Sequence, residues 1–392
     1  MAKELSGGRT LVVVGGPHPS ALPERTLKDC ADFDAAVVGE GEAAIVELAE
    51  RGPGPGVAGL VYREGGGLVS TPPRTPEHDL DRLGEPAYEL FDMAHYTAPD
   101  RWLIRWLRLR ATNVRTSRGC TNRCRFCGGH LVAGVGMRYH SVGYVVGLIR
   151  RAVEEFRVEA IRFEDDTLGG DRERLLELCE AVRSSGLARR IVWDGCLRAD
   201  QAEPQVLAAM KSAGCIQVEY GFESGADEAL RRLGKNSSAE LNRRAVRLTR
   251  EAGLRVFADI MVGLPGETEE DFDATLRFLR WARPEVLSPA WMAPLPGTAV
   301  YDNLPAEVRE SLQWRRFTYL DEFGPRINLT AMSDQVFAER YRRFMKYLVR
   351  PTLARQLLRD SSPDEVELRR NLRRRIRTFA LHHPIRAARL PV

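Results

Sequence analysis

The chain of 392 residues is predicted to be an α/β protein built around a parallel sheet. Two observations predict this class. Between residues 111 and 298, short apolar runs of strand length alternate six times with amphipathic stretches of helix length. Several of the apolar runs end in turns rich in glycine and proline. Because strands joined by helices run parallel with right-handed crossovers, the six units predict a six-stranded parallel sheet, too few for a closed eight-unit barrel.

The first hundred residues predict a separate, smaller α/β unit. Its expected elements are strands at residues 10–14 and 35–38, helices at 22–29 and 42–50, and a hairpin of residues 60–62 and 67–69. A Gly-Pro-Gly-Pro-Gly run at residues 52–56 breaks the chain before the hairpin. Residues 1–100 are therefore assigned to one domain.

Residues 101–300 carry the six repeated units, and residues 301–392 are predicted to be helical. The expected strands are residues 113–116, 160–164, 190–195, 215–222, 255–263 and 287–293, with helices at 145–156, 172–184, 203–212 and 239–252. Ligand-binding residues are expected where these strands end, as in complete barrels.

Composition excludes several classes of protein. Hydrophobic residues make up 44% and charged residues 29%, which is typical of a globular domain, and no apolar run reaches the length of a membrane span. The amino terminus lacks the apolar core of a signal peptide, so we expect a cytoplasmic protein without a membrane partner. The net charge is +4, and the many arginines after Tyr341 are interpreted as a solvated helix face, so no nucleic-acid partner is expected.

Three cysteines, Cys120, Cys124 and Cys127, carry the strongest functional signal. Their C-x3-C-x2-C spacing places three thiolates on one short loop after the first expected strand of the sheet. Three thiolates can hold three irons of a 4Fe–4S cluster and leave the fourth iron open to a ligand. A structural zinc site needs four ligands, and His130 does not have the spacing of the fourth. A disulfide framework would need paired cysteines.

This spacing, with Phe126 before the last cysteine, resembles the signature of the radical S-adenosylmethionine (SAM) superfamily, and the resemblance extends from Gly15 to about Tyr301. It implies a partial (β/α)6 barrel that is open on one side for the substrate. It also implies that the open iron binds the amino and carboxylate groups of SAM. One electron, from a flavodoxin- or ferredoxin-type donor, would then split SAM into methionine and a 5′-deoxyadenosyl radical.

The resemblance assigns contacts with SAM to the ends of the later strands. Glu223 and Ser224, in a Glu-Ser-Gly step, correspond to the contact with the ribose. The acidic run Glu164, Asp165 and Asp166 corresponds to the contact with the methionyl amino group.

Further positions complete the expected SAM site. Arg198 is a candidate for the SAM carboxylate, because a guanidinium binds a carboxylate through two hydrogen bonds, but a structural salt bridge would explain it as well. The turn with Gly263 and Pro265 resembles the adenine-side turn of the family, where glycine lets the backbone approach a ligand. Phe126 is counted with these cofactor-binding residues.

Strand alternation separates the two faces of the expected fourth strand. Gln217, Glu219 and Glu223 share one face, which we expect to line the barrel, and apolar side chains share the other. Glu219, Tyr220 and Cys196 are the candidates for handling protons or hydrogen. For Glu219, neutralising an interior arginine remains the alternative.

The amino-terminal region, at residues 12–24, 38–42 and 83–91, resembles the radical SAM subfamily that carries a cobalamin-binding domain. That domain normally contains D-x-H-x-x-G, whose histidine binds cobalt, and this motif is absent from the sequence. His18 lies in a proline-flanked loop and is not expected to replace it. We therefore expect a truncated remnant of the domain and no cobalamin.

Together these features predict a radical SAM enzyme, a lyase or an oxidoreductase, that takes hydrogen from a small polar substrate. The expected reaction is the dehydration or deoxygenation of a sugar or aminoglycoside, as in a diol dehydratase of antibiotic biosynthesis. A cobalamin-dependent methyltransferase and an RNA-modifying enzyme are the alternatives within the superfamily. A non-enzymatic iron–sulfur electron carrier is the alternative outside it.

Overall fold

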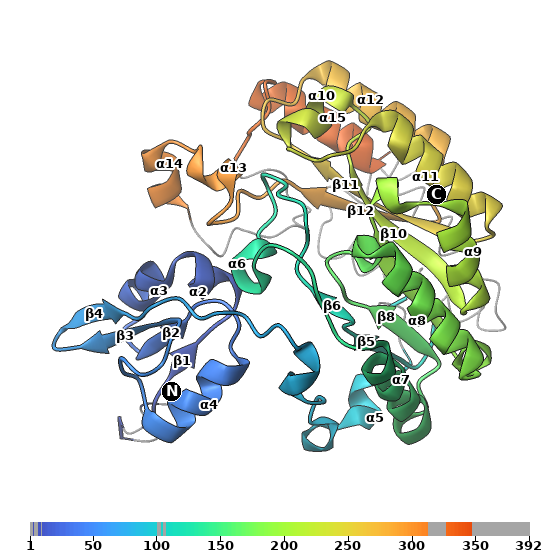
Figure 1. Ribbon diagram of the computed structural model, residues 1–392. Coiled ribbons are helices and arrows are strands. Elements are labelled where there is room, and N and C mark those ends of the chain that lie inside the picture. Colours follow the sequence, from blue (N-terminus) through green and yellow to red (C-terminus); the bar gives the residue numbers. More distant parts are fainter. Residues whose placement is uncertain are drawn as a thin grey trace, which may run out of the picture.

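A curled, open sheet of six parallel strands forms the centre of the molecule (Figure 1). The computed structural model describes residues 3, 7–8, 10–99, 103–104, 107–312 and 327–346. It confirms the predicted α/β class and the partial barrel. The strands stand in chain order from one edge of the sheet to the other: β5 (Ala111–Val114), β8 (Ala160–Phe163), β9 (Val192–Leu197), β10 (Cys215–Glu223), β11 (Arg255–Val262) and β12 (Val286–Trp291).

Helices cover the outer face of this sheet. The larger ones are α7 (Val142–Phe156), α8 (Arg172–Ser184), α9 (Pro204–Ser212), α11 (Ala239–Glu251) and α12 (Glu269–Ala282); the shorter ones are α10 (Asp227–Arg232), η3 (Leu168–Gly170), η4 (Leu187–Arg189) and η5 (Ala199–Gln201). Side chains of Ser141, Asp171, Ser238 and Thr268 cap α7, α8, α11 and α12 by accepting a hydrogen bond from a backbone N–H in the first turn. Each such cap stabilises its helix by about 1 kcal/mol, so these helix starts are fixed locally.

The main core lies between the sheet and these helices. Trp193, Val218, Tyr220 and Phe222 are buried there, with Phe278 of α12 against the ring of Phe222. Because side chains alternate along a strand, the opposite faces of the same strands turn toward the interior of the barrel.

A second sheet of four strands forms the amino-terminal unit. β1 (Val13–Val14) pairs in parallel with β2 (Ala35–Val37), which pairs antiparallel with the hairpin of β3 (Leu60–Glu64) and β4 (Gly67–Ser70). The helices of this unit are α2 (Pro17–Ala21), α3 (Pro23–Asp29) and α4 (Glu42–Arg51). The short helix α2 stands where the sequence predicted a loop, because Pro17 begins it and proline is tolerated in a first helical turn.

A strap connects the two sheets. It contains η1 (Leu80–Leu83), η2 (Tyr88–Leu90) and α5 (Met93–Tyr96). Asp81 accepts hydrogen bonds from the backbone N–H of Ser141 and pairs with His140, and the hydroxyl of Tyr144 donates to the carbonyl of Gly84. The strap is therefore bound along the start of α7.

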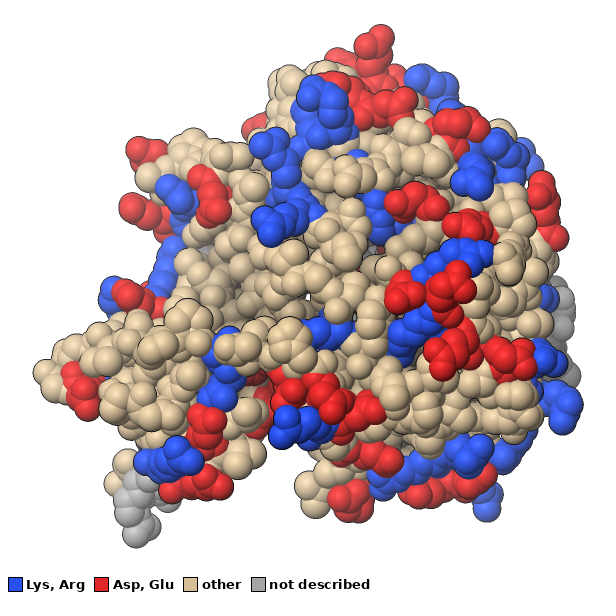
Figure 2. Space-filling model, viewed as in Figure 1, with Lys and Arg blue, Asp and Glu red and all other residues tan. Residues whose placement is uncertain are grey.

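Beyond the sheet the described chain is helical, with α13 (Ala299–Asp302), α14 (Ala306–Ser311) and α15 (Asp334–Phe344). Phe337 and Phe344 of α15 are buried against Trp291 and Phe272 of the barrel. Most of the predicted arginine-rich segment, from Arg350 onward, lies outside the described residues. On the face seen in Figure 2, basic and acidic side chains are interspersed over the barrel. Within the described ranges, no helix has the length and apolar character to span a membrane.

Candidate active site

The three cysteines lie on a loop that a two-stranded ribbon closes at its base. β6 (Ser117–Arg118) pairs antiparallel with β7 (Arg138–Tyr139), and the loop between them carries the short helix α6 (His130–Ala133). Gly119 begins the loop with φ +89°, and an added Cβ would lie 2.2 Å from the carbonyl oxygen of Gly136. Only glycine fits where these two backbone segments come so close. The ribbon therefore fixes the point at which the loop leaves the sheet.

The thiol of Cys127 lies close enough to those of Cys120 and Cys124 to interact with both electrostatically. Backbone N–H groups of Asn122 and Gly129 donate to the sulfurs of Cys120 (3.5 Å) and Cys127 (3.4 Å). Such hydrogen bonds help set the properties of iron–sulfur clusters. This donor set fits a 4Fe–4S cluster held by three thiolates.

Burial raises the pKa of the Cys124 thiol, and the positive charges of Lys235 and Arg198 oppose that rise. Burial likewise raises the pKa of the Cys127 thiol. Metal-binding cysteines must be deprotonated. The nearby cations therefore favour the thiolate form that iron requires.

The acidic run after β8 divides between two environments. Oδ1 of Asp165 accepts hydrogen bonds from the backbone N–H groups and hydroxyls of Thr116 and Ser117, at 2.5–3.2 Å. Burial raises the pKa of Asp165 to about 6, although these hydrogen bonds act against the rise. Asp166 instead accepts from the N–H of Gly119 (3.1 Å) and lies near the Cys127 thiol. Asp165 therefore anchors the strand that precedes the cysteines, and Asp166 is the carboxylate nearer to the cluster loop.

At the end of β10, Glu223 forms an ion pair with Lys235 (2.7 Å), and both side chains are about nine-tenths buried. Glu223 has φ +62° at a bulge in the strand, a conformation that side chains rarely adopt. The bulge turns its carboxylate toward the cysteines, since Glu223 interacts electrostatically with both Cys124 and Cys127. An added Cβ at Gly221 would lie 2.5 Å from Oε1 of Glu223, so glycine there makes room for the pair.

Arg198 lies near Cys124, but its guanidinium is engaged. It pairs with Asp200 (3.1 Å) and donates to the carbonyl of Asn236 (2.8 Å). Arg198 therefore forms the salt bridge that was one explanation for it. It also lies beside the cluster loop, as the other explanation requires. Phe126 packs against apolar residues at the barrel end, among them Ala226 and Met261, and so holds the cysteine loop to the barrel.

Inside the barrel, Arg162 of β8 is the centre of a charged network. Its guanidinium binds Glu164 (2.9 Å), Asp194 (3.1 Å) and Glu219 (2.5 Å), and Asp194 also accepts from the side-chain amide of Gln217 (2.9 Å). Burial raises the pKa of Asp194 to about 7 despite the opposing charge of Arg162. Glu219 therefore neutralises an interior arginine, which was the alternative left open for it. Glu164 belongs to the same network.

The other two candidates for hydrogen handling lie on opposite sides of the sheet. Cys196 is half-buried inside the barrel near Glu219 and Asp259, and desolvation there raises the pKa of its thiol. Tyr220 points outward into the core, where its hydroxyl bonds that of Thr249 at 2.7 Å and no part of it is exposed. The expectation that Tyr220 acts on substrate is wrong, because alternation along β10 puts it on the face opposite Glu219.

The glycine turn after β11 is held by a buried carboxylate. Oε2 of Glu267 accepts hydrogen bonds from the N–H groups of Gly263 (2.9 Å) and Leu264 (3.3 Å), and Gly263 has φ +80°. Burial raises the pKa of Glu267 to about 7. Pro265 lies in the same turn, half-buried. Glu267 thus fixes the turn that resembles the adenine-side turn of the family.

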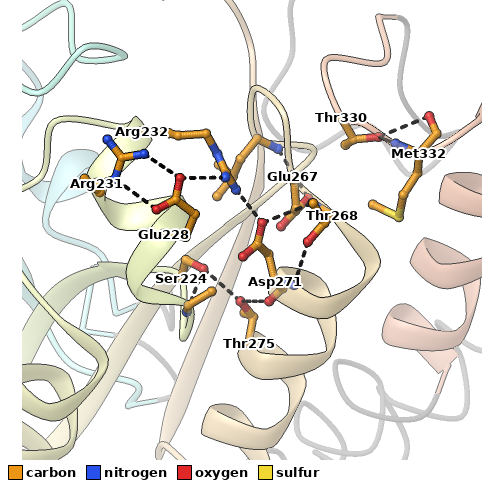
Figure 3. A network of polar contacts seen from close by, with 12 residues as sticks. Ser224, Glu228, Arg231, Arg232, Glu267, Thr268, Asp271, Thr275, Thr330 and Met332 are labelled. Atoms are coloured by element: carbon orange, nitrogen blue, oxygen red, sulfur yellow. Dashed lines mark hydrogen bonds and ion pairs between the residues drawn. The ribbon is translucent and has the colours of Figure 1, made fainter.

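Ser224 belongs to a network that supports this turn from the helix side (Figure 3). Its hydroxyl bonds that of Thr275 at 2.9 Å and is fully buried. Nearby, Asp271 at the start of α12 binds Arg232, which also pairs with Glu228. Ser224 therefore joins the end of β10 to α12, and its side chain is occupied there.

Comparison with known proteins identifies the family. Residues 114–279 match the Radical SAM superfamily. An uncharacterized methyltransferase of Pyrococcus horikoshii is 30% identical over 345 residues, which cover 87% of this chain and 72% of that protein. The chain belongs to the radical SAM superfamily.

Solved structures share the fold of this radical SAM chain. The radical SAM methyltransferase TsrM from Kitasatospora setae, with cobalamin and a [4Fe–4S] cluster bound, superposes with a TM-score of 0.60 at 19% identity, over 76% of this chain and 59% of TsrM. The cobalamin-dependent radical enzyme OxsB, with aqua-cobalamin and SAM bound, gives 0.58 at 20% identity, over 76% of this chain and 43% of OxsB. The chain thus spans about half the length of these two proteins.

These comparisons correct two expectations. The expected dehydration of a sugar or aminoglycoside is overturned, because the relatives and the structural neighbours include methyltransferases. The expected independence of cobalamin is overturned as well, because the shared fold is that of proteins solved with cobalamin bound. Without the D-x-H-x-x-G motif, one protein ligand of the cobalt would be missing. The rest of the large cobalamin surface could still be bound by other residues.

The amino-terminal unit offers a partial fit for that cofactor. Glycine turns follow the neighbouring parallel strands β1 and β2, and a Cβ added at Gly16 or Gly41 would meet no atom within 4 Å. Both glycines lie just beyond the carboxyl ends of these strands, where α/β folds bind ligands. Burial lowers the pKa of His18 in α2, and its sequence context provides no lower-ligand motif. The chain's fit to cobalamin therefore rests on backbone turns and not on a histidine.

Three residues of the site escaped prediction. Lys235 lies twelve positions after its partner Glu223, and no local pattern links the two. Asp259 shares a hydrogen bond with Glu219 inside the barrel, and burial raises its pKa. The lone carboxylate in strand β11, which is apolar from Val256 onward apart from it, was the signal that could have revealed it. Glu267 lies in the glycine turn after β11, and nothing in its own sequence context marks it as a buried carboxylate.

Proposed function

We propose that this chain is a cobalamin-dependent radical SAM methyltransferase. The observation that carries the proposal is the place of the cluster loop between the amino-terminal unit and the barrel (Figure 1). The loop follows the first barrel strand, and its helix α6 packs against α2 of the amino-terminal unit. Gly297 lies between Leu131 of α6 and Ala21 of α2. A methyl donor bound in the barrel and a carrier bound at the glycine turns would thus be neighbours.

Several residues would prepare the barrel for SAM. Cys120, Cys124 and Cys127 would hold the cluster, which when bound supplies an open iron for SAM and an electron. Lys235 and Glu223 place opposite charges beside the thiols, and fixed charges in a buried site need no reorganisation during reaction. Glu267 and Asp166, described above, would hold the surrounding backbone.

The turns after β1 and β2 would hold cobalamin, which when bound supplies a carrier for the methyl group. Ser20 of α2 donates its hydroxyl to the carbonyl of Gly16 (2.8 Å) and accepts the N–H of Gly39 (2.9 Å). One side chain therefore ties the two turns together. This arrangement would present backbone groups to the cofactor in a fixed relation.

The substrate is proposed to be a small polar molecule that enters the open side of the barrel. Glu219, Asp259 and Cys196 face the interior and could contact it. Asp259 shares a hydrogen bond with Glu219, and because burial raises the pKa of Asp259, that carboxyl group could hold a proton at this point. A flavodoxin- or ferredoxin-type protein is proposed as the electron donor.

The test is anaerobic reconstitution with iron, sulfide and hydroxocobalamin, followed by gel filtration and incubation with reductant and methyl-labelled SAM. We expect about one cobalamin retained per chain, and S-adenosylhomocysteine formed only when both cofactors are present. Products heavier by a methyl group would then be sought in a metabolite extract by mass spectrometry. A chain that retains no cobalamin and forms only 5′-deoxyadenosine would contradict the proposal, and transfer of a methylthio group would redirect it.

A further inference from the structure

One carboxylate of the amino-terminal unit, Glu40, binds both strands of the ribbon that carries the cysteine loop. Its Oε1 lies 2.9 Å from Nη1 of Arg118 in β6 and 2.7 Å from Nη2 of Arg138 in β7, and its Oε2 lies 3.0 Å from Nη1 of Arg138. The side chain of Glu40 is only 8% exposed, and those of the two arginines are 17% and 10% exposed. Bidentate pairing of this kind fixes direction as well as distance.

Each arginine has a second attachment at the loop. Arg118 precedes Cys120 by two residues and also pairs with Glu42 (2.5 Å). Arg138 donates to the carbonyl of Ala133, the last residue of α6 (2.9 Å), and to the carbonyl of Glu77 in the strap (2.5 Å). One guanidinium therefore joins the cysteine loop, the strap and the amino-terminal unit.

The backbone of the turn after β2 directs the side chain of Glu40 toward the ribbon of β6 and β7. Gly39 has φ +84°, a conformation that favours glycine, and its N–H is bound by Ser20. Burial acts against ionisation of Glu40, but the hydrogen bonds and charges of Arg138 and Arg118 outweigh it and lower its pKa. The carboxylate is charged where it meets the arginines, and its removal would leave two half-buried cations with one remaining carboxylate partner, Glu42 at Arg118.

We propose that Glu40 is a positioning residue for the iron–sulfur cluster, which fixes the base of the cysteine loop by binding Arg118 and Arg138 together. It touches neither the cysteines nor SAM and acts through the two arginines. The inference rests on the cluster assignment of the proposed function and not on methyl transfer or cobalamin. It also means that the amino-terminal unit supports the base of the cysteine loop from outside the cluster site.

The test compares Glu40→Gln with Glu47→Gln in the reconstituted full chain. Glu47 is a matched control, because it forms a bidentate pair with Arg74 (3.0 and 2.5 Å) in the same unit, away from the cysteine loop. We expect Glu40→Gln to lose iron to EDTA roughly 10-fold faster than the wild-type chain, as changes in outer-shell partners of metal sites do. The electron paramagnetic resonance spectrum of the reduced cluster should broaden or shift, and Glu47→Gln should match the wild type in both measurements.

A second variant guards against a simple folding defect. Arg138→Lys keeps the charge and loses the two-point contact, so it should fall between the wild type and Glu40→Gln. The melting temperature of each apo chain is measured alongside. If Glu40→Gln lowers the melting temperature but keeps the wild-type rate of iron loss and the wild-type spectrum, the residue only joins the domains and the inference is wrong. A wild-type chain that takes up no cluster would overturn the inference together with the proposed function, whereas a loaded chain without methyl transfer would overturn only the latter.

Discussion

The barrel and the amino-terminal unit both carry glycine turns at the carboxyl ends of parallel strands, yet they prepare those ends differently. In the barrel, side chains fill the space: at Gly221, near the end of β10, an added Cβ would lie 2.5 Å from Glu223 and 2.9 Å from Lys235, and at Gly263, in the turn after β11, it would lie 3.0 Å from the ring of Phe337. In the amino-terminal unit, an added Cβ at Gly16 or Gly41 would meet nothing within 4 Å. The barrel holds its polar groups in place before any ligand arrives, and the smaller unit offers open backbone.

This difference explains why the two edges suit different ligands. Fixed charges at short distance suit a small ligand with charged ends, such as SAM. Open turns suit a large ligand held over much of its surface. Among the described residues, Glu40 of the smaller unit is tied as firmly as the barrel groups are, and it is tied to the cluster loop.

The largest effect should come from the cluster cysteines. Replacing Cys120, Cys124 or Cys127 by Ser should abolish SAM cleavage and reduce bound iron, because each thiolate holds one iron of the cluster. Cys30→Ser, in the amino-terminal unit, is the matched control and should leave iron content unchanged. Iron analysis and chromatography of the SAM products measure the outcome. Full turnover by any of the three loop variants would refute the site.

The second effect concerns stability and compares the two regions directly. Arg162→Met should lower the free energy of unfolding by roughly 3–5 kcal/mol, because it leaves Asp194 and Glu219 buried without their cation. Arg74→Met breaks the pair with the more exposed Glu47 and should cost much less, because solvent screens an exposed pair. Urea denaturation gives both values. Equal losses would show that the barrel network is no more constrained than the pair in the smaller unit.

A smaller effect is expected at the end of β10. Glu223→Gln should weaken SAM binding by roughly 1–3 kcal/mol, because it leaves Lys235 without its counter-charge beside the thiols. Glu228→Gln, on the exposed surface of α10, is the control. Calorimetric titration of the reconstituted chain with SAM measures both. Unchanged affinity in Glu223→Gln would mean that this pair supports the fold alone.

The last effect is a gradual one, a dependence on pH from the turn after β11. Burial raises the pKa of Glu267 to about 7, so the native chain binds this proton more tightly than the unfolded chain does. Its contribution to stability is full at acidic pH and is lost as pH rises through about 7. Glu267→Gln should therefore remove up to about 1.4 kcal/mol per pH unit from the fall in unfolding free energy between about pH 5 and 7. Denaturation at several pH values tests this, with the exposed Glu270→Gln as control, and an unaltered slope would show that Glu267 titrates normally.

The sequence predicted correctly those helix and strand bounds that depend on residues close together in the chain. The helix at residues 172–184 was predicted with the bounds that the structure shows, because Asp171 caps it and glycine ends the segment that follows. The hairpin and most barrel strands were placed to within about three residues for the same reason. Tyr220 is the exception. Alternation along the strand already placed its side chain on the outer face, and that position is incompatible with its assignment as a catalytic candidate.

The sequence by itself determined the cluster loop, since three cysteines within eight residues meet wherever that loop lies. It also determined the class of fold, because the periodicity of apolar residues is a property of each segment. Tertiary structure decided which charges meet: Lys235 reaches Glu223, Asp259 reaches Glu219, and Glu40 reaches Arg118 and Arg138 from 78 and 98 positions away. Such pairs depend on how the two sheets close around the cysteine loop, and a single sequence carries no local signal of distances between residues so far apart along the chain.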